Sequence, residues 1–165
     1  MFQSRKSQPF EVLPRVVTPE AGAAPSGSLA PVTGAPYRTP VPLQPGLCGS
    51  IVLEVADADT ANAMRSGEVP VLATPRVVAL CEEASVQALT NRLAPGETTV
   101  GMRVQLDHLA PTGVGQRVTA DATLEKVEGR RLTFTVSVND NRGLVAAGKV
   151  TRVIVNRERF LDKTS

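Results

Sequence analysis

The apolar residues between positions 74 and 108 follow two different periods along the chain. In the first half they recur at steps of three and four residues, which places them on one face of a helix. The members of this face are Val77, Leu80, Cys81, Ala84, Ala88 and Leu89. In the second half the period is two, which is typical of a strand with one buried face. The members of that face are Val100, Met102, Val104, Leu106 and His108, the only histidine of the chain.

Local signals indicate where this helix begins and ends. Thr74 is a favoured N-cap residue, because its hydroxyl can accept a hydrogen bond from a free backbone N–H. Pro75 follows at the first helical position, where a missing N–H costs nothing. Pro95 and Gly96 are expected to end the helix. The pattern therefore predicts a capped helix, a turn, and a strand whose terminal histidine faces the apolar side.

Further strands are expected on both sides of this unit. Residues 49–55 (GSIVLEV) form a short strand candidate, and residues 56–64 are expected to be a short helix or a loop. Three strands follow the histidine, with hairpin signals at residues 128–130 and 139–143. Alternation places two sets of residues on their inner faces: Val118, Ala120, Ala122 and Leu124, then Leu132, Phe134, Val136 and Val138. Gly148 in the last strand indicates a bulge or a bend.

This order of elements predicts an α+β fold. Hairpin-connected strands pair in antiparallel fashion, and one long amphipathic helix must bury its apolar face against the apolar face of the sheet. An antiparallel sheet wrapped around one long central helix is the hot-dog fold. One sheet leaves an edge and part of the helix uncovered, so a homodimer is expected, with a dimer of dimers left open.

The first 46 residues differ from the remainder in composition. They contain nine of the thirteen prolines, among Gly, Ala and Ser, and no sustained apolar period. Such a segment buries too little surface to offset the entropy of ordering it. We therefore expect a disordered or extended tail over residues 1–46 and one hot-dog domain over residues 47–165.

Composition and charge exclude several functions. The net charge is +2 with acids and bases interspersed, so neither nucleic acid nor a membrane surface is an expected partner. No apolar run reaches the roughly 20 residues of a membrane span, and the N-terminus shows no signal-peptide pattern. Cys48 and Cys81 lack metal-ligand spacing, so no metal site is expected. A cytoplasmic location follows as the prediction.

Three residues of the helix–strand unit carry candidate chemistry. Glu82 lies just over two helical turns after Thr74, near the edge of the buried stripe, whereas Glu83 is expected to face solvent. Taken singly, Glu82 reads as a surface charge and His108 as a satisfied strand-end histidine. Together, a hydroxyl at a helix start, a carboxylate on the helix and an inward-facing imidazole could converge on one pocket and activate water or carry an acyl group.

The same positions resemble the fluoroacetyl-coenzyme A thioesterase family of hot-dog proteins. The resemblance rests on Ala73-Thr74, on Glu82, and on a GxxVxxxH pattern from Gly101 to His108 that continues into Ala-Pro-Thr. The stretches EGRRL at residues 128–132 and AAGKVTR ending at Arg152 are also similar. The similarity covers roughly residues 47–160.

This resemblance implies hydrolysis of an acyl-CoA thioester in a dimer, without a metal or other cofactor. It implies that Thr74, Glu82 and His108 form the catalytic group. Glu82 would act as general base or transient nucleophile, and His108 would bind the thioester oxygen or assist the thiolate. Gly101 and Arg152 are the implied substrate-binding residues, with Arg152 pairing with a carboxylate or a coenzyme phosphate.

The sequence departs from the family in one respect. Family members specific for fluoroacetate carry phenylalanines before the catalytic threonine, whereas residues 49–73 contain no aromatic side chain. Fluoroacetyl selectivity is therefore not predicted. Two alternatives to a thioesterase remain open: a non-catalytic module that binds acyl-CoA, and a hot-dog enoyl-CoA hydratase or dehydratase.

Overall fold

The computed structural model describes residues 42–164, which form a single antiparallel sheet packed on one helix. Most of the predicted N-terminal tail lies outside the described residues. In the described part of that tail, residues 42–46, Leu43 already packs against the core. In chain order the elements are β1 (Cys48–Glu54), η1 (Asp57–Asp59), α1 (Thr74–Gln87), β2 (Glu97–His108), β3 (Arg117–Glu128), β4 (Arg131–Asp140), β5 (Gly143–Asn156), α2 (Arg157–Leu161) and η2 (Asp162–Thr164).

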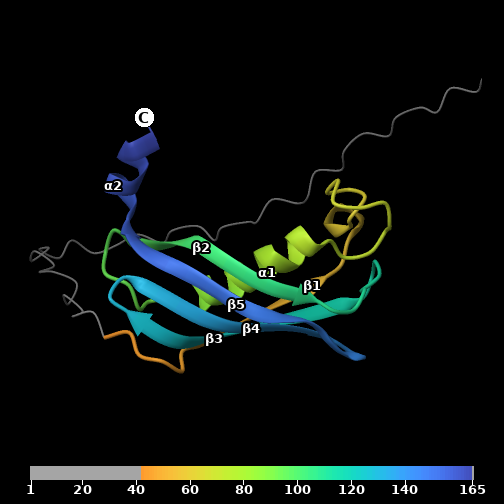
Figure 1. Cartoon of the computed structure of the whole chain (residues 1–165), viewed down its shortest axis with the longest axis horizontal. Helices are drawn as coiled ribbons and strands as arrows, with labels where there is room; N and C mark the ends of the chain where they lie inside the picture. Colours follow the sequence, from red (N-terminus) through yellow and green to blue (C-terminus); the bar gives the residue numbers. More distant parts are fainter. Residues whose placement is uncertain (1–41, 165) are drawn as a thin grey trace, which may run out of the picture. The chain divides into compact units, whose positions relative to one another are not determined.

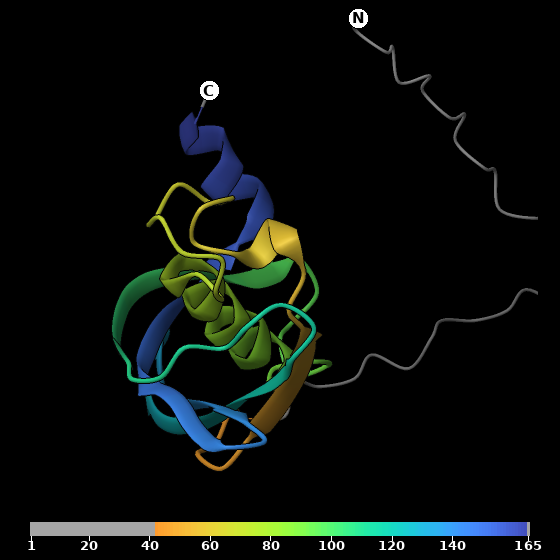
Figure 2. The same cartoon turned by 90° about the vertical axis from the view of Figure 1, so that its right-hand side faces the viewer.

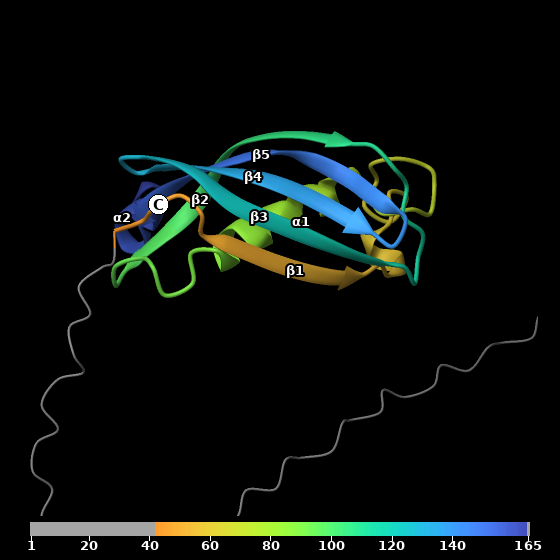
Figure 3. The same cartoon turned by 90° about the horizontal axis from the view of Figure 1, so that it is seen from below.

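The five strands lie in the order β1-β3-β4-β5-β2, and every neighbouring pair is antiparallel (Figures 1 and 3). Seen along the sheet, the strands curl around α1 and leave one side of the helix open between the edge strands β1 and β2 (Figure 2). The predicted α+β arrangement of a sheet wrapped around one long helix is thus confirmed.

The core forms where the inner faces of β3 and β4 meet the apolar face of α1. Every residue that alternation placed on those inner strand faces is at most 2% exposed, and Phe134 is the largest of them. The predicted helical face is also buried, from Val77 to Leu89. The two periods read from the sequence therefore located the core correctly.

The helix begins and ends differently from the prediction. Its N-cap residue is Ala73, which makes no side-chain capping bond, and Thr74 is the first helical residue. The hydroxyl of Thr74 is consequently free for a tertiary contact. At the other end α1 stops at Gln87, and a series of turns precedes β2, so Pro95 and Gly96 lie beyond the helix.

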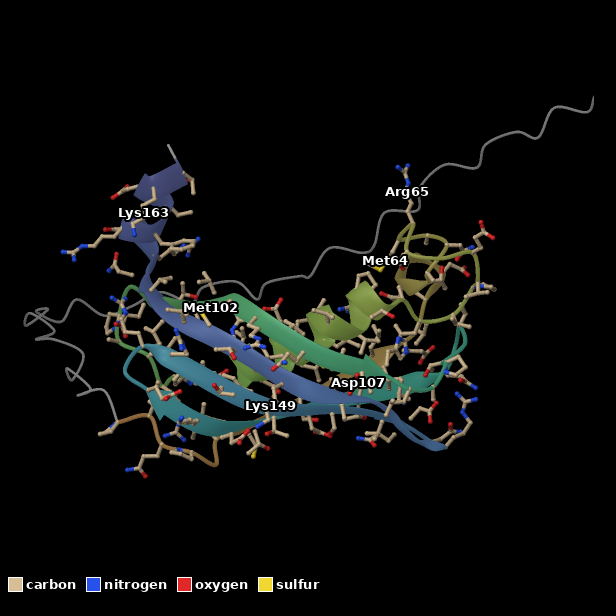
Figure 4. The ribbon with its side chains drawn as sticks, viewed as in Figure 1. Met64, Arg65, Met102, Asp107, Lys149 and Lys163 are labelled. Atoms are coloured by element: carbon tan, nitrogen blue, oxygen red, sulfur yellow. The ribbon has the colours of Figure 1, made fainter. Side chains whose placement is uncertain are left out.

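A bulge interrupts β2 and changes which residues face the helix. The register between β2 and β5 shifts between Gly101 and Arg103. Before the shift, Thr99 is buried at 8% exposure, and after it Val104 and Leu106 pack against the core. The prediction that Met102 belongs to the apolar face is wrong, because the bulge leaves it 50% exposed at the sheet edge (Figure 4).

The expected bulge at Gly148 is absent from β5. Its register with both β2 and β4 is regular at this point. A Cβ on Gly148 would instead overlap the backbone of Gln105 on the neighbouring strand. Glycine is needed here because β2 and β5 approach each other too closely for a side chain.

The segment between β1 and α1 is tied down by backbone contacts. Thr60 bridges to Leu72 and Val71 bridges to Gly113. The N–H of Ala73 donates to the carbonyl of Asp59 at 2.8 Å. These bonds fix the point at which α1 starts. Within the described range, no helix is both long and apolar enough to cross a membrane.

The burial of Cys81 generates a first prediction. Cys81 is fully buried on α1, and burial, reinforced by the charge of Glu82, raises the pKa of its thiol to about 11. Cys48 is exposed. Because the thiolate is the reactive form, iodoacetamide at about pH 8 should label one thiol in the native protein and two in denaturant, as counted by mass spectrometry. Rapid labelling of both thiols in the folded protein would contradict the packing of α1.

Candidate functional site

Thr74 and His108 meet at the N-terminal end of α1. Thr74 is the first residue of the helix and His108 the last residue of β2. The Oγ1 atom of Thr74 lies 2.9 Å from Nδ1 of His108, which is hydrogen-bond distance. This contact uses the hydroxyl that capping leaves free, and it fixes the orientation of the imidazole.

The second ring nitrogen of His108 is unpartnered. Its Nε2 atom is the one buried side-chain nitrogen or oxygen among residues 42–164 without a hydrogen-bond partner. Such a group carries a desolvation penalty unless something binds it. The imidazole lines a cavity of about 310 Å³, together with Thr74, Pro111 and aliphatic side chains of the segment before α1.

Glu82 belongs to a second group of residues, farther along the helix. Nη1 of Arg152 donates to Oε1 of Glu82 at 2.8 Å. The Arg152 side chain is 7% exposed and that of Glu82 is 35% exposed. The pair therefore joins a buried cation on β5 to a carboxylate that reaches the surface of α1.

Thr99 on β2 holds the guanidinium of Arg152 in place. Nε of Arg152 donates to the hydroxyl of Thr99, and Nη2 donates to its carbonyl, each at 2.9 Å. Burial lowers the pKa of Arg152, and the charge of Glu82 opposes that shift. From the sequence, either a carboxylate or a coenzyme phosphate was the expected partner of Arg152. In the structure its partner is the carboxylate of Glu82, which Arg152 holds in position.

Gly101 lies directly beneath the carboxylate of Glu82. A Cβ at this position would overlap Oε1 of Glu82, so only glycine allows the carboxylate to rest on the strand. Together with Glu82 and Arg152, Gly101 lines an open cavity of about 710 Å³ on the uncovered side of α1. Apolar and polar residues of β1, α1 and β2 complete its lining: Ile51, Ala79, Val86 and Val100, with Glu83, Gln87 and Thr99.

Within one chain the predicted site residues form two groups rather than one. Thr74 and His108 line one cavity, and Glu82 lines another that shares no residue with it. Eight residues separate Thr74 from Glu82, which is about 12 Å along the helix axis. The expected convergence of all three in one pocket is therefore not met inside a single subunit.

Glu83 and Thr99 lie next to the site residues, and the sequence predicted the exposure of Glu83 but not the burial of Thr99. Glu83 is exposed and pairs with Arg76 at 2.7 Å, so the expectation that it faces solvent is confirmed. Thr99 was missed, because the alternation drawn from Val100 assigned it to the outer face. The glycine at position 101, inside a strand pattern, was the one sequence sign of the bulge that turns Thr99 inward.

No group of three metal-ligating side chains occurs in the part of the chain that the structure describes. The two groups supply a hydroxyl and an imidazole at the start of α1, and a carboxylate and a guanidinium farther along it. They can orient water, donate to a developing oxyanion and move a proton.

Comparison with known proteins places these residues in a family context. The family described as FlK, fluoroacetyl-CoA-specific thioesterase, matches residues 55–158. A fluoroacetyl-CoA thioesterase of Streptantibioticus cattleyicolor is 39% identical over 90 residues, which cover 54% of this chain and 65% of that protein. The chain thus matches slightly less than two thirds of the length of this relative.

Solved structures show the same fold. The fluoroacetyl-CoA thioesterase FlK is 32% identical, with a TM-score of 0.71 over 75% of this chain and 96% of that chain. A hypothetical Thermus thermophilus protein, described as a thioesterase superfamily member, is 29% identical, with a TM-score of 0.69 over 74% of this chain and 91% of its own. A hot-dog-like protein from Thermanaerovibrio acidaminovorans is 27% identical with a TM-score of 0.67, covering 73% and 89%. The predicted hot-dog fold and family are confirmed.

The Arg152 network generates a second prediction. Arg152→Met would leave the Thr99 carbonyl and hydroxyl without their donor and remove the partner of Glu82. Because Glu82 is partly hydrated, we expect a loss of about 2–4 kcal/mol in the free energy of unfolding, measured by urea denaturation. A double-mutant cycle with Glu82→Gln should show coupling between the two positions. Additive effects and a loss below about 0.5 kcal/mol would contradict the network.

Proposed function

We propose that this chain, which belongs to the fluoroacetyl-CoA-specific thioesterase family, hydrolyses acyl-CoA thioesters to a carboxylic acid and coenzyme A. The observation that carries the proposal is the Glu82 carboxylate, held by Arg152 over the bare backbone of Gly101 at the wall of an open cavity. The activity of the relatives supports the same chemistry.

Glu82 supplies the attack on the thioester carbon. Arg152 engages its Oε1 atom, and among residues 42–164 no hydrogen bond is made to Oε2. That oxygen can remove a proton from water as the water attacks, or attack the carbonyl carbon itself to give an anhydride that water then opens. On either route the C–S bond breaks, the thiolate takes up a proton, and the acid is released.

His108 supplies stabilisation of the developing oxyanion. When the Thr74 hydroxyl donates to Nδ1, the proton of the neutral imidazole lies on Nε2. Nε2 is the buried atom that lacks a partner in the described structure. A thioester oxygen placed there would satisfy it and gain a donor in a site sheltered from water. Thr74 acts here as a positioning residue.

A homodimer would bring these two groups together. β2 is an edge strand with His108 at its end and Gly101 near its middle. When two copies pair their β2 strands around a two-fold axis, the strands run antiparallel. His108 of one subunit then lies toward the half of the other β2 strand that carries Gly101, above which the Glu82 carboxylate of α1 rests. The second copy would also cover the exposed Met102 and the open side of α1.

The acyl group would occupy the cavity beside His108. Its walls carry short aliphatic side chains, among them Ala61, Val69 and Leu72, and no aromatic ring. A cavity of about 310 Å³ accommodates more than a two-carbon acyl group. We therefore infer an aliphatic acyl chain longer than acetyl or fluoroacetyl as the preferred substrate.

The cytoplasm is the setting we propose for this reaction. Both cysteines are free thiols in the structure. Free thiols persist in the reducing compartment in which acyl-CoA is used, whereas secreted proteins tend to form disulfides.

Replacing Glu82 tests the catalytic role directly. Glu82→Gln preserves the shape of the side chain but removes the base, so kcat should fall by roughly 10²–10⁴-fold. The adjacent Glu83→Gln is the matched control: it removes a carboxylate from the same helix turn and the same cavity lining, but one that pairs with Arg76 instead of Arg152, and it should keep near wild-type activity. Thiol release from acyl-CoA is the readout, with circular dichroism confirming the fold. Undiminished hydrolysis by Glu82→Gln would remove Glu82 from the mechanism.

Mixed dimers test whether the site is shared between subunits. Glu82→Gln and His108→Ala should each be inactive alone. If Glu82 works with His108 of the partner subunit, a mixed dimer carries one doubly defective site and one intact site. Random mixing should then restore about a quarter of wild-type activity per subunit pair. If both residues act within one chain, mixing restores nothing, and the shared site is refuted.

A further inference from the structure

A third cavity lies at the far end of the sheet from His108, where β5 passes into α2 (Figure 1). Its volume is about 350 Å³. The lining residues come from the β3–β4 hairpin, the last residues of β5 and the C-terminal helices: Arg130, Val153, Ile154, Val155, Asn156, Arg159, Phe160 and Lys163. None of them takes part in the chemistry assigned to Glu82 or His108.

The cations of this cavity are not neutralised by the protein. Arg130, Arg159 and Lys163 line it, and no acidic side chain does. The ion pairs formed by residues 42–164 use other lysines and arginines. The acidic neighbours on the same helical segment, Glu158 and Asp162, lie outside the lining. Three cations that line one cavity without a counter-charge favour an anion of more than one charge.

Two further features narrow the kind of anion. Nε of Arg130 donates to the carbonyl of Ile154 at 2.8 Å, which anchors the guanidinium while its Nη groups face no described acceptor. Phe160, one of two aromatic residues after position 46, forms part of the wall and is 40% exposed. An aromatic ring beside cations suits a base carried by a phosphorylated sugar. Lys163 projects from the same end of the molecule (Figure 4).

We propose that this cavity binds the phosphorylated adenosine end of the acyl-CoA substrate. The inference rests on the proposed function, and it assigns the end of the substrate that the catalytic groups do not contact. The cavity begins at Val153, one residue after Arg152, which holds Glu82. Along β5, Asn156 lies about 13 Å beyond Arg152, a span that the extended pantetheine arm can cover.

A pair of substrates separates this inference from the proposed function. Acyl-CoA carries the nucleotide, whereas the matching acyl-N-acetylcysteamine thioester has the same reacting bond without it. The Arg159→Gln/Lys163→Gln double variant should raise KM for acyl-CoA roughly tenfold or more with little change in kcat. Its kcat/KM for the short thioester should equal that of wild type. Arg117→Gln is the control for lost surface charge, because Arg117 is 75% exposed and lies outside the cavity.

Adenosine 3′,5′-bisphosphate provides an independent probe. It should inhibit wild-type hydrolysis of acyl-CoA competitively and bind the double variant roughly tenfold more weakly by calorimetry. An equal KM for acyl-CoA in both proteins would overturn the inference and leave the thioesterase intact. If wild type hydrolyses neither thioester, the proposed function fails, and calorimetry alone decides: weaker binding by the double variant supports a nucleotide site, and equal binding refutes it.

Discussion

Packing of one helix into the hollow of one curved sheet is the constraint on which the site depends. The apolar stripe of α1 is buried against β3 and β4, and this fixes the rotation of the helix about its axis. Once that rotation is set, Glu82 has to emerge at the margin of the stripe, toward the open side and above Gly101. Thr74, at the helix start, has to meet the end of β2. The packing of the core therefore determines the positions of Glu82 and Thr74.

Glu82 carries its charge at the margin of the apolar stripe of α1, and the ion pair with Arg152 stabilises the carboxylate there. A half-buried carboxylate needs a partner, and an arginine inside a sheet needs several acceptors. Thr99 supplies two of them through its side chain and backbone, and Glu82 supplies the third. The bulge in β2 turns Thr99 toward the arginine. A local irregularity of the strand thus fixes the direction of the catalytic carboxylate.

Periodicity located the core because a buried face repeats over many residues of a helix or strand. The buried residues of the strands between positions 118 and 138 match the predicted alternation closely. Periodicity failed where one residue changes the pattern. The bulge at Met102 exchanges the inward and outward faces of β2, and Gly101 is the one residue in the sequence that hints at it. Thr74 was read as a cap because local chemistry favours that role, but a tertiary partner, His108, took its hydroxyl. The separation of Thr74 from Glu82 depends on three-dimensional distance and on a second copy of the chain, which one sequence does not display.

The central claim is that this chain cleaves acyl-CoA, and that an aliphatic cavity beside His108 sets the acyl group. Thiol release by the wild-type protein across acetyl-, fluoroacetyl-, branched and medium-chain acyl-CoA tests it most directly. The account predicts turnover, with kcat/KM highest for an aliphatic acyl group longer than acetyl. A folded protein that binds these esters and releases no thiol from any of them would contradict it and indicate a binding module instead.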